Sequence, residues 1–210
     1  MTERMWLGRF LVYLLTPPVR ALMRVKIIGK ENIPPKGEKI VLCCNHISNW
    51  DPVLLEVAQP MRHIYFMAKA ELFKNRLFAW LLGKQIGAFA VHRGTGDTAA
   101  LDTAKQLVED GKIMGIFPEG TRSKDGKLMR AKSGTALIVS QTGAMVLPVA
   151  IVTRGQHVRP LRRTLVVYGK PVTPAELHLD GEKPDIRYAS RRLMEIIGGL
   201  IEQHRAEVER

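Results

Sequence analysis

Apolar residues along the chain fall into short runs that alternate with stretches of helical periodicity. The short runs are rich in residues that suit buried strands and lie at residues 24–29, 40–44, 64–68, 88–91, 113–117, 145–152 and 164–168. Helical stretches run through residues 77–82, from 97 to 111, from 133 to 142 and from near 185 to the end. Strands that alternate with helices predict an α/β fold with a mixed, largely parallel sheet flanked by helices.

Capping and breaking residues mark where several of these elements begin, end or change. Asp51 precedes a proline and an apolar run, which predicts an N-cap, a first helical position and a helix. Asp97 and Gly111 predict the start and the end of another helix. Pro148 lies inside the run 145–152 and predicts an interruption of that strand.

The N-terminal stretch has too few polar residues for a soluble surface helix. Residues 5–15 form an apolar run interrupted by Arg9, and Pro17 and Pro18 end it before a second short helix through residues 19–23. The run is shorter than the roughly 20 apolar residues that span a bilayer. Large apolar side chains with interspersed arginines suit a helix that lies in an anionic membrane interface. The alternative is a pair of helices packed on the protein's own core.

The positive net charge of the chain predicts an anionic partner. The 210 residues carry a formal net charge of +12, with a pI near 10.0, and the basic residues are spread along the chain. Such a chain suits nucleic acid, an anionic lipid surface or a phosphorylated substrate. The sequence has no zinc-finger, basic-zipper or RNA-recognition signature, so nucleic acid is the second choice and is not the expected partner.

Cysteine and histidine usage predicts neither a disulfide framework nor a metal. Cys43 and Cys44 are adjacent within a predicted strand, so their side chains point to opposite faces and they are expected to be buried free thiols in a reducing compartment. The histidines do not lie at ligand spacing from cysteine or aspartate, so no metal is expected.

Candidate chemistry gathers where the run 40–44 ends. His46 follows this run, and Asp51 begins the next helical stretch, so the two side chains flank one loop. A carboxylate beside an imidazole can fix its tautomer and stabilise the imidazolium, as for a general base. Each residue alone has a plainer interpretation: Asp51 as a helix cap and His46 as a hydrogen-bonded loop histidine.

Two segments together carry a resemblance to a known family. An Asn-His-x4-Asp pattern spans residues 45–51, and Phe-Pro-Glu-Gly-Thr-Arg-Ser spans residues 117–123. In this order and at this separation they resemble the glycerolipid acyltransferase family, over about residues 29 to 171. The resemblance implies a domain at residues 25–210 that transfers acyl chains, preceded by a helical membrane-docking segment at residues 1–24.

The resemblance also assigns roles to residues. His46 would take the proton of the acceptor hydroxyl, and Asp51 would orient His46. Binding of the acceptor's glycerophosphate would fall to Glu119, Gly120, Thr121, Arg122, Arg93 and Lys69. A plainer interpretation of Glu119 is an ion pair with Arg122 that shapes the loop, and of Lys69 a solvated lysine. Backbone N–H groups around Gly120 are candidates for stabilising the oxyanion.

The implied reaction moves a fatty acyl chain from acyl carrier protein or coenzyme A to the sn-2 hydroxyl of lysophosphatidic acid, with no cofactor and no covalent acyl-enzyme. Glycerol-3-phosphate or another lysophospholipid is an alternative acceptor. A protein of this kind would bind a phospholipid surface at the cytoplasmic face of the cell membrane, as a peripheral or monotopic protein. A different class is a non-enzymatic basic protein that binds membranes or nucleic acid.

Overall fold

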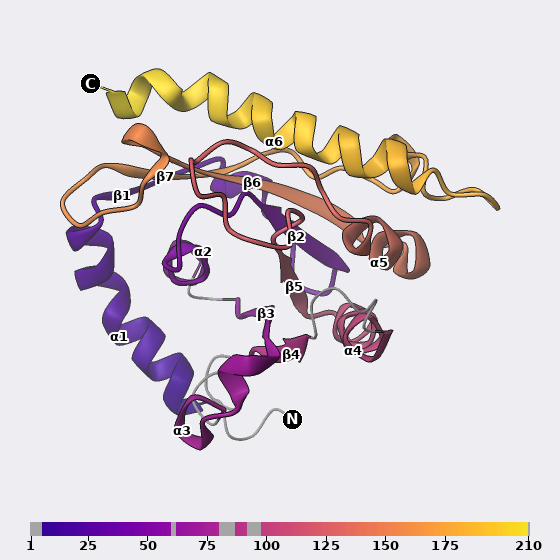
Figure 1. Ribbon diagram of the computed structural model, residues 1–210, viewed down its shortest axis with the longest axis horizontal. Helices are drawn as coiled ribbons and strands as arrows, with labels where there is room; N and C mark the ends of the chain where they lie inside the picture. The colour runs from indigo at the N-terminus through magenta and orange to yellow at the C-terminus, as the bar shows by residue number, and fades with distance from the viewer. Residues whose placement is uncertain (1–5, 60–61, 80–86, 92–97, 210) are drawn as a thin grey trace.

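One mixed sheet forms the centre of the molecule (Figure 1). The computed structural model describes residues 6–59, 62–79, 87–91 and 98–209. Within them, seven strands are ordered β1-β7-β6-β2-β5-β3-β4. Their bounds are β1 Val25–Ile28, β2 Ile40–Cys44, β3 Ile64–Lys69, β4 Phe89–Val91, β5 Ile113–Ile116, β6 Met145–Thr153 and β7 Thr164–Tyr168. All neighbours pair in parallel except β6 and β7, so the predicted α/β fold with a mixed, largely parallel sheet is confirmed.

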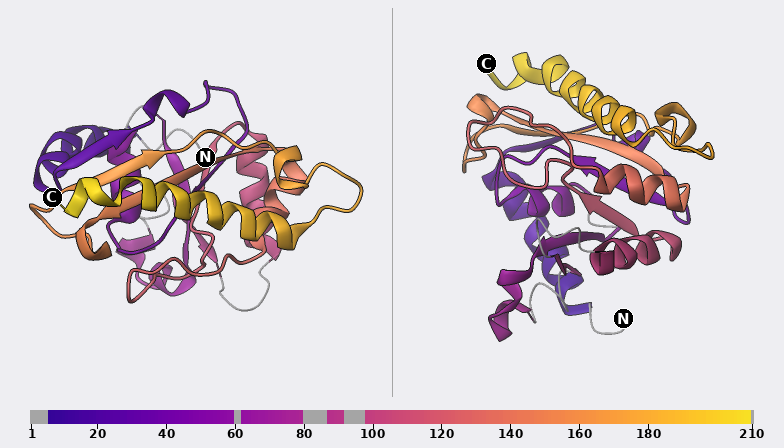
Figure 2. Two further views of the ribbon diagram at one scale, coloured as in Figure 1. Left: turned by 90° about the horizontal axis from the view of Figure 1, so that it is seen from above. Right: turned by 45° about the vertical axis from the view of Figure 1, so that its right-hand side comes forward.

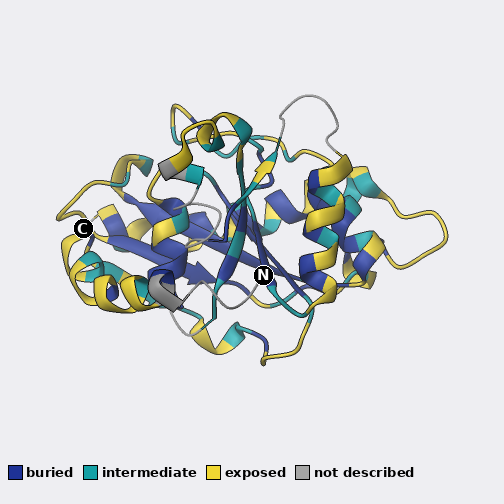
Figure 3. Ribbon diagram, turned by 90° about the horizontal axis from the view of Figure 1, so that it is seen from below, coloured by how far each residue is buried: buried dark blue, intermediate teal, exposed yellow. Residues whose placement is uncertain are grey.

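Helices cover both faces of this sheet (Figures 1 and 2). The α-helices of the described residues are α1 Trp6–Leu22, α2 Asp51–Ala58, α3 Arg76–Ala79, α4 Thr98–Glu109, α5 Gly134–Thr142 and α6 Ile186–Glu209. Helices α4, α5 and α6 contribute to one apolar core, and α2 contributes to a second core on the other face. The strands between them are largely buried (Figure 3).

The two cysteines show the alternation that separates these cores. Cys43 belongs to the core of α4, α5 and α6, and Cys44 belongs to the core of α2. Both thiols are free and fully buried, as predicted. Burial raises the pKa of each thiol well above its usual value, which keeps both in the unreactive neutral form.

Helix α1 corrects the prediction of two N-terminal helices. It runs without a break through Pro17 and Pro18. A proline removes one N–H from the helical ladder, so the carbonyl groups of Tyr13 and Leu14 lose their usual donors. Both residues are exposed, and their carbonyl groups can bond to solvent instead. No helix in the described part of the chain is long and apolar enough to cross a bilayer.

Strand β6 corrects the predicted interruption at Pro148, because it continues through this residue to Thr153. The Pro148 carbonyl accepts a 2.8 Å hydrogen bond from the N–H of Gly169, just after β7 ends. The N–H and carbonyl of one strand residue point to the same side, so the missing N–H would have faced the end of β7. The pairing of β6 with β2 on the other side therefore loses no donor, and Pro148 still lies opposite Cys43.

The parallel strands bring the candidate residues to one edge. Strands β2, β3, β4 and β5 all run in the same direction, so their carboxyl ends lie together. His46 follows β2, Lys69 ends β3, and the segment 117–123 follows β5. This is the edge at which parallel α/β sheets usually bind ligands.

Candidate active site

The end of β2 is fixed by a side chain that extends the sheet. The Asn45 amide donates to the Ile151 carbonyl at 3.0 Å, and its Oδ1 accepts from the Ile151 N–H at 2.8 Å. Asn45 thus uses its side chain to continue the pairing of β2 with β6 by one step. These two bonds hold the backbone in place at the point where the chain leaves the sheet, and His46 is the next residue.

His46 and Asp51 form a hydrogen-bonded pair. The His46 Nδ1 lies 2.8 Å from Asp51 Oδ2, and the same oxygen accepts from the N–H groups of Ile47 at 2.7 Å and Ser48 at 2.8 Å. Asp51 is fully buried, whereas the His46 side chain is 12% exposed. Because a carboxylate only accepts hydrogen bonds, Nδ1 carries the proton and Nε2 presents its lone pair. This is the tautomer that a general base at Nε2 requires.

Asp51 does not act as the N-cap that the sequence predicted. Helix α2 begins at Asp51 itself, and Trp50 occupies the cap position without a side-chain cap bond. The carboxylate turns instead to the loop N–H groups before the helix and to the imidazole. The predicted helix is confirmed, but Pro52 is its second residue and not its first.

The segment after β5 makes a tight turn beside this pair. The N–H of Gly120 donates to the carbonyl of Phe117 at 3.0 Å, and Gly120 has a φ of 71°, which suits glycine. Since this N–H is already bonded, oxyanion stabilisation by N–H groups around Gly120 would fall to its neighbours, and it stays a prediction. Lys132 closes the other side of the turn, because its N–H donates to the Pro118 carbonyl at 2.8 Å.

Glu119 ties this turn to the backbone of His46. Its Oε1 accepts from the His46 N–H at 2.7 Å, and its Oε2 accepts from the Met129 N–H at 3.1 Å. The N–H of Ser123 in turn donates to the His46 carbonyl at 2.8 Å. Burial raises the pKa of the Glu119 carboxyl, and the two N–H donors offset part of that rise. The suggested ion pair with Arg122 is not formed, because Glu119 faces inward and Arg122 is exposed.

An aromatic stack supports the imidazole from a third side. The rings of His46 and Phe117 lie 4.1 Å apart at 18°, and Phe66 stacks on Phe117 at 5.8 Å. Sequence reasoning missed this stack. The available signal was limited to a phenylalanine in each of two apolar runs, Phe66 in the run 64–68 and Phe117 at the end of the run 113–117, because the sequence does not show which strands become neighbours.

The predicted acceptor-binding residues occupy different surroundings. Thr121 and Arg122 are exposed in the loop after the turn. Lys69 is exposed at the end of β3 and pairs with Glu71 at 3.2 Å. Arg93 lies outside the described residues, as do Asp97 and residues 80–82 of the helical stretch 77–82, whose first three residues belong to α3.

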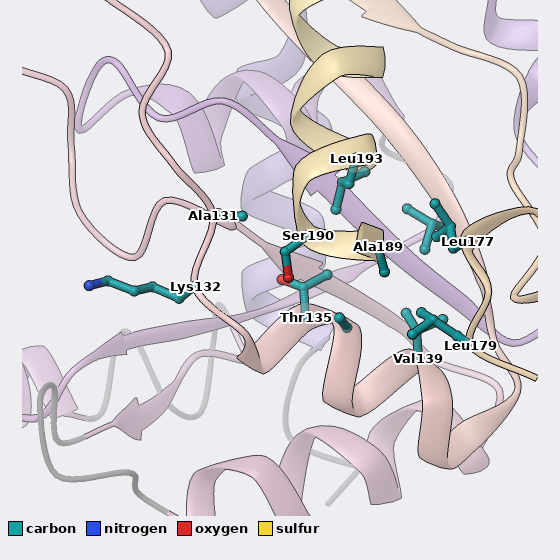
Figure 4. Close-up of a pocket in the computed structure, with 11 residues that line it drawn as sticks. Ala131, Lys132, Thr135, Val139, Leu177, Leu179, Ala189, Ser190 and Leu193 are labelled. Atoms are coloured by element: carbon teal, nitrogen blue, oxygen red, sulfur yellow. The ribbon is translucent and has the colours of Figure 1, made fainter. Parts of the chain in front are cut away.

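The described residues contain no group of three or more histidine, cysteine or acidic side chains that could hold a metal ion. A cavity is found between α5 and α6, lined by residues such as Val139, Leu177 and Leu193 (Figure 4). Its volume of about 10 Å³ suits a group no larger than one water molecule. None of His46, Asp51 or Glu119 lines it.

Comparisons with known proteins agree with this geometry. An acyltransferase family model matches residues 24–152, which hold both motifs. A "1-acyl-sn-glycerol-3-phosphate acyltransferase" of Bacillus subtilis is 32% identical over 163 residues, covering 76% of this chain and 79% of the relative. A Streptococcus pneumoniae protein of the same name is also 32% identical, over 57% of this chain and 44% of its own length.

A solved structure is similar over nearly the whole fold. The crystal structure of the 1-acyl-sn-glycerophosphate acyltransferase PlsC from Thermotoga maritima superposes with a TM-score of 0.68 at 22% identity. The match covers 97% of this chain and 84% of that one. With a family model over more than half of the sequence and a relative matched along most of its length, this chain belongs to the acyltransferase family.

Proposed function

We propose that the protein transfers a fatty acyl chain from a thioester donor to the sn-2 hydroxyl of lysophosphatidic acid, which gives phosphatidic acid. The observation that carries this proposal is the His46–Asp51 pair, held beside the Glu119–Arg122 segment. Relatives named for this activity support the choice of acceptor. The non-enzymatic alternative does not account for a histidine with its Nδ1 tied to a buried carboxylate.

The chemistry needs one base and no covalent acyl-enzyme. His46 Nε2 accepts the proton of the acceptor hydroxyl while the hydroxyl oxygen attacks the thioester carbonyl. Asp51 stabilises the imidazolium that forms. The tetrahedral intermediate then expels the thiolate as the C–S bond breaks. The imidazolium returns its proton to the sulfur, which releases a free thiol and leaves His46 neutral.

Recognition of the acceptor phosphate falls to basic side chains at the same sheet edge. Arg122 is exposed next to the turn and has the planar donor geometry that suits phosphate. We assign supporting roles to Lys69 and Arg93, and to Gly120 and Thr121 at the turn. Contact of Glu119 with the acceptor stays a prediction, since its two oxygens bond to backbone N–H groups.

The proposal includes a lipid surface for α1. Apolar side chains along this helix are exposed, including Tyr13 at 68% and Leu14 at 57%. An exposed apolar face of this size suits the interfacial region of a bilayer. Docking of residues 1–24 would place the enzyme at the cytoplasmic face of the membrane as a peripheral or monotopic protein, with acyl carrier protein or coenzyme A as the donor carrier and no cofactor.

The decisive experiment compares wild type with His46→Ala, using labelled acyl donor and lysophosphatidic acid in vesicles. We expect wild type to form phosphatidic acid and the variant to lose about 10²–10⁴-fold in kcat, the usual contribution of a general base. His178→Asn is a matched control, because His178 is exposed and stacks on Tyr188 rather than on a motif residue. Full turnover in His46→Ala would refute this base. Transfer by wild type only to glycerol-3-phosphate would change the acceptor and keep the chemistry.

A further inference from the structure

The connection between β6 and β7 carries a dense positive charge. Residues 154–163 contain no aspartate or glutamate. They contain four arginines, all exposed: Arg154, Arg159, Arg162 and Arg163. None forms an ion pair with a carboxylate of the described residues, and Arg163 donates to the backbone carbonyl of Glu207 at 3.1 Å. The positive charge of this connection is therefore uncompensated by its immediate surroundings.

An exposed leucine lies among these arginines. The Leu161 side chain is 70% exposed, the largest value among the exposed large apolar residues of the described chain. Its backbone N–H donates to the Leu22 carbonyl at 2.6 Å, at the C-terminal end of α1. Val158 packs on the core beneath. The connection is thus anchored on both sides, while its leucine points to the outside.

This position continues the exposed apolar face of α1. Leu22, the last residue of α1, is itself exposed. Figure 1 shows the end of α1 beside the connection between β6 and β7, with the start of α6 at the opposite end of the molecule. Leu161 therefore lies next to the C-terminal end of α1, and both it and Leu22 are exposed there.

We propose that residues 154–163 form a second contact with an anionic lipid surface, in which Leu161 enters the interface and the arginines bind lipid phosphates. This inference rests on the proposed docking of α1 and extends it. An apolar side chain flanked by arginines matches the apolar and phosphate layers of a bilayer interface. Guanidinium groups bind phosphate through paired hydrogen bonds.

Glu207, whose backbone carbonyl accepts from Arg163, does not neutralise this charge. Glu207, at the end of α6, already bonds to Lys26 at 2.8 Å and to His204 at 2.7 Å. Only its backbone carbonyl contacts the connection, through Arg163. Arg154, Arg159 and Arg162 consequently remain available to an external anion, and continuity with the apolar face of α1 favours lipid over an acidic protein.

Sedimentation with vesicles of phosphatidylcholine and phosphatidylglycerol tests this contact with the full chain. We expect Arg159→Ala/Arg162→Ala to lower the vesicle partition coefficient roughly tenfold or more at about 0.1 M salt, with a smaller loss at high salt. Leu161→Asn should lower it several-fold at both salt concentrations, because it removes apolar contact. Asparagine suits the left-handed φ of 63° at this position, so the variant keeps the local backbone.

A matched control removes the same charge elsewhere. Lys183→Ala/Arg187→Ala alters two exposed basic residues at the opposite end of the molecule and should bind vesicles like wild type. If the wild-type protein did not bind anionic vesicles, the proposed docking of α1 would itself be refuted. Loop variants that partition like wild type would overturn this inference alone. If they also showed a raised KM for acyl carrier protein, the loop would bind an acidic protein and not lipid.

Discussion

His46 is held in its working orientation before any substrate arrives. Asp51 fixes one ring nitrogen, Phe117 stacks on the ring face, and Glu119 holds the backbone N–H. These contacts come from two parts of the chain, the first residue of α2 and the segment after β5, so the imidazole has little freedom to turn. Preorganisation of this kind lowers the barrier because the base needs no rearrangement during the reaction.

The charge of Asp51 is predicted to matter more than its shape. In Asp51→Asn, an amide oxygen in place of Oδ2 would keep all three contacts but lose the negative charge that stabilises the imidazolium. An amide nitrogen there would donate to Nδ1 but face the N–H groups of Ile47 and Ser48 as a further donor. We expect kcat to fall by about 10²–10⁴-fold with little change in KM for the acceptor. Steady-state kinetics over a range of acceptor concentrations measures this split.

The same helix offers a matched control for this change. Glu56 on α2 pairs with His63 at 3.1 Å and accepts the Ile64 N–H at 3.0 Å, outside the candidate site. Glu56→Gln should lower stability while kcat stays within a few-fold of wild type. Equal losses of kcat in Asp51→Asn and Glu56→Gln would mean that Asp51 acts only through the fold.

At the scale of elements, α2 connects the candidate site with α1. Asp51 lies at its first residue, and Arg20 of α1 donates to the carbonyl groups of Val57 at 2.7 Å and Ala58 at 3.2 Å at its end. Arginine at this position satisfies carbonyl groups that a helix leaves unpaired and complements the helix dipole. The membrane-docking helix of the proposal is thus bonded directly to the helix that orients the base.

The packing of β5 against β3 predicts a sensitive glycine. A Cβ at Gly115 would lie 2.5 Å from Ile64 Cγ2 and 2.5 Å from Phe66 Cε1, so both side chains would have to move. We expect Gly115→Ala to lower the free energy of unfolding by about 1–3 kcal/mol. It should also reduce activity, because Phe66 supports the stack on His46.

Denaturant unfolding measures this effect, and Gly181→Ala is the control. A Cβ at Gly181 meets nothing within 4 Å, so its substitution should change stability by no more than about 0.5 kcal/mol. If Gly115→Ala unfolded at the same denaturant concentration as wild type, the packing between β3 and β5 would accommodate the added methyl group, and the prediction would be wrong.

At the scale of the whole molecule, the net charge and the exposed apolar residues both suit an anionic lipid surface. The net charge of +12 suits an anionic surface, and the exposed apolar residues of α1 give that surface a place to dock. The sheet edge with His46 and Arg122 is built on the same chain that carries this face. A lipid substrate and a lipid surface are therefore consistent with one overall design.

The free energy of unfolding should depend on pH through the carboxyl group of Glu119. Because its folded pKa is raised above the ordinary value of 4.5, the folded protein binds this proton more tightly than the unfolded chain. The contribution of this group to stability is complete below pH 4.5 and is lost as the pH rises through the folded pKa. Glu119→Gln should lack this decline.

The test measures the unfolding free energies of wild type and Glu119→Gln from below pH 4.5 to above the folded pKa of Glu119. Their difference isolates Glu119, since the other titrating groups are shared. We expect wild type to lose stability relative to the variant as the pH rises, and the difference to level off above the folded pKa. A difference that rises with pH would show that the N–H donors of His46 and Met129 outweigh burial.

The sequence was sufficient for the strands, most helices and the two motifs. Apolar runs such as residues 40–44 carry enough local information, because buried parallel strands must be apolar along their length. Predictions failed at Pro17, Pro18 and Pro148, where local rules predicted a break. At Pro17 and Pro18 the carbonyl groups without a donor can bond to solvent, and at Pro148 the missing N–H faces the end of β7. Neither feature can be recognised from the residues around each proline in the sequence.

The residue types of the candidate site were determined by the sequence, since a base, its carboxylate and an arginine are recognisable at motif spacing. Tertiary structure alone decided how Glu119 and Phe117 act, because both contact His46 from more than 70 residues away in the chain. It also brought Leu161 against the end of α1. Such pairings depend on strand order in the sheet, and no local pattern encodes which strands become neighbours.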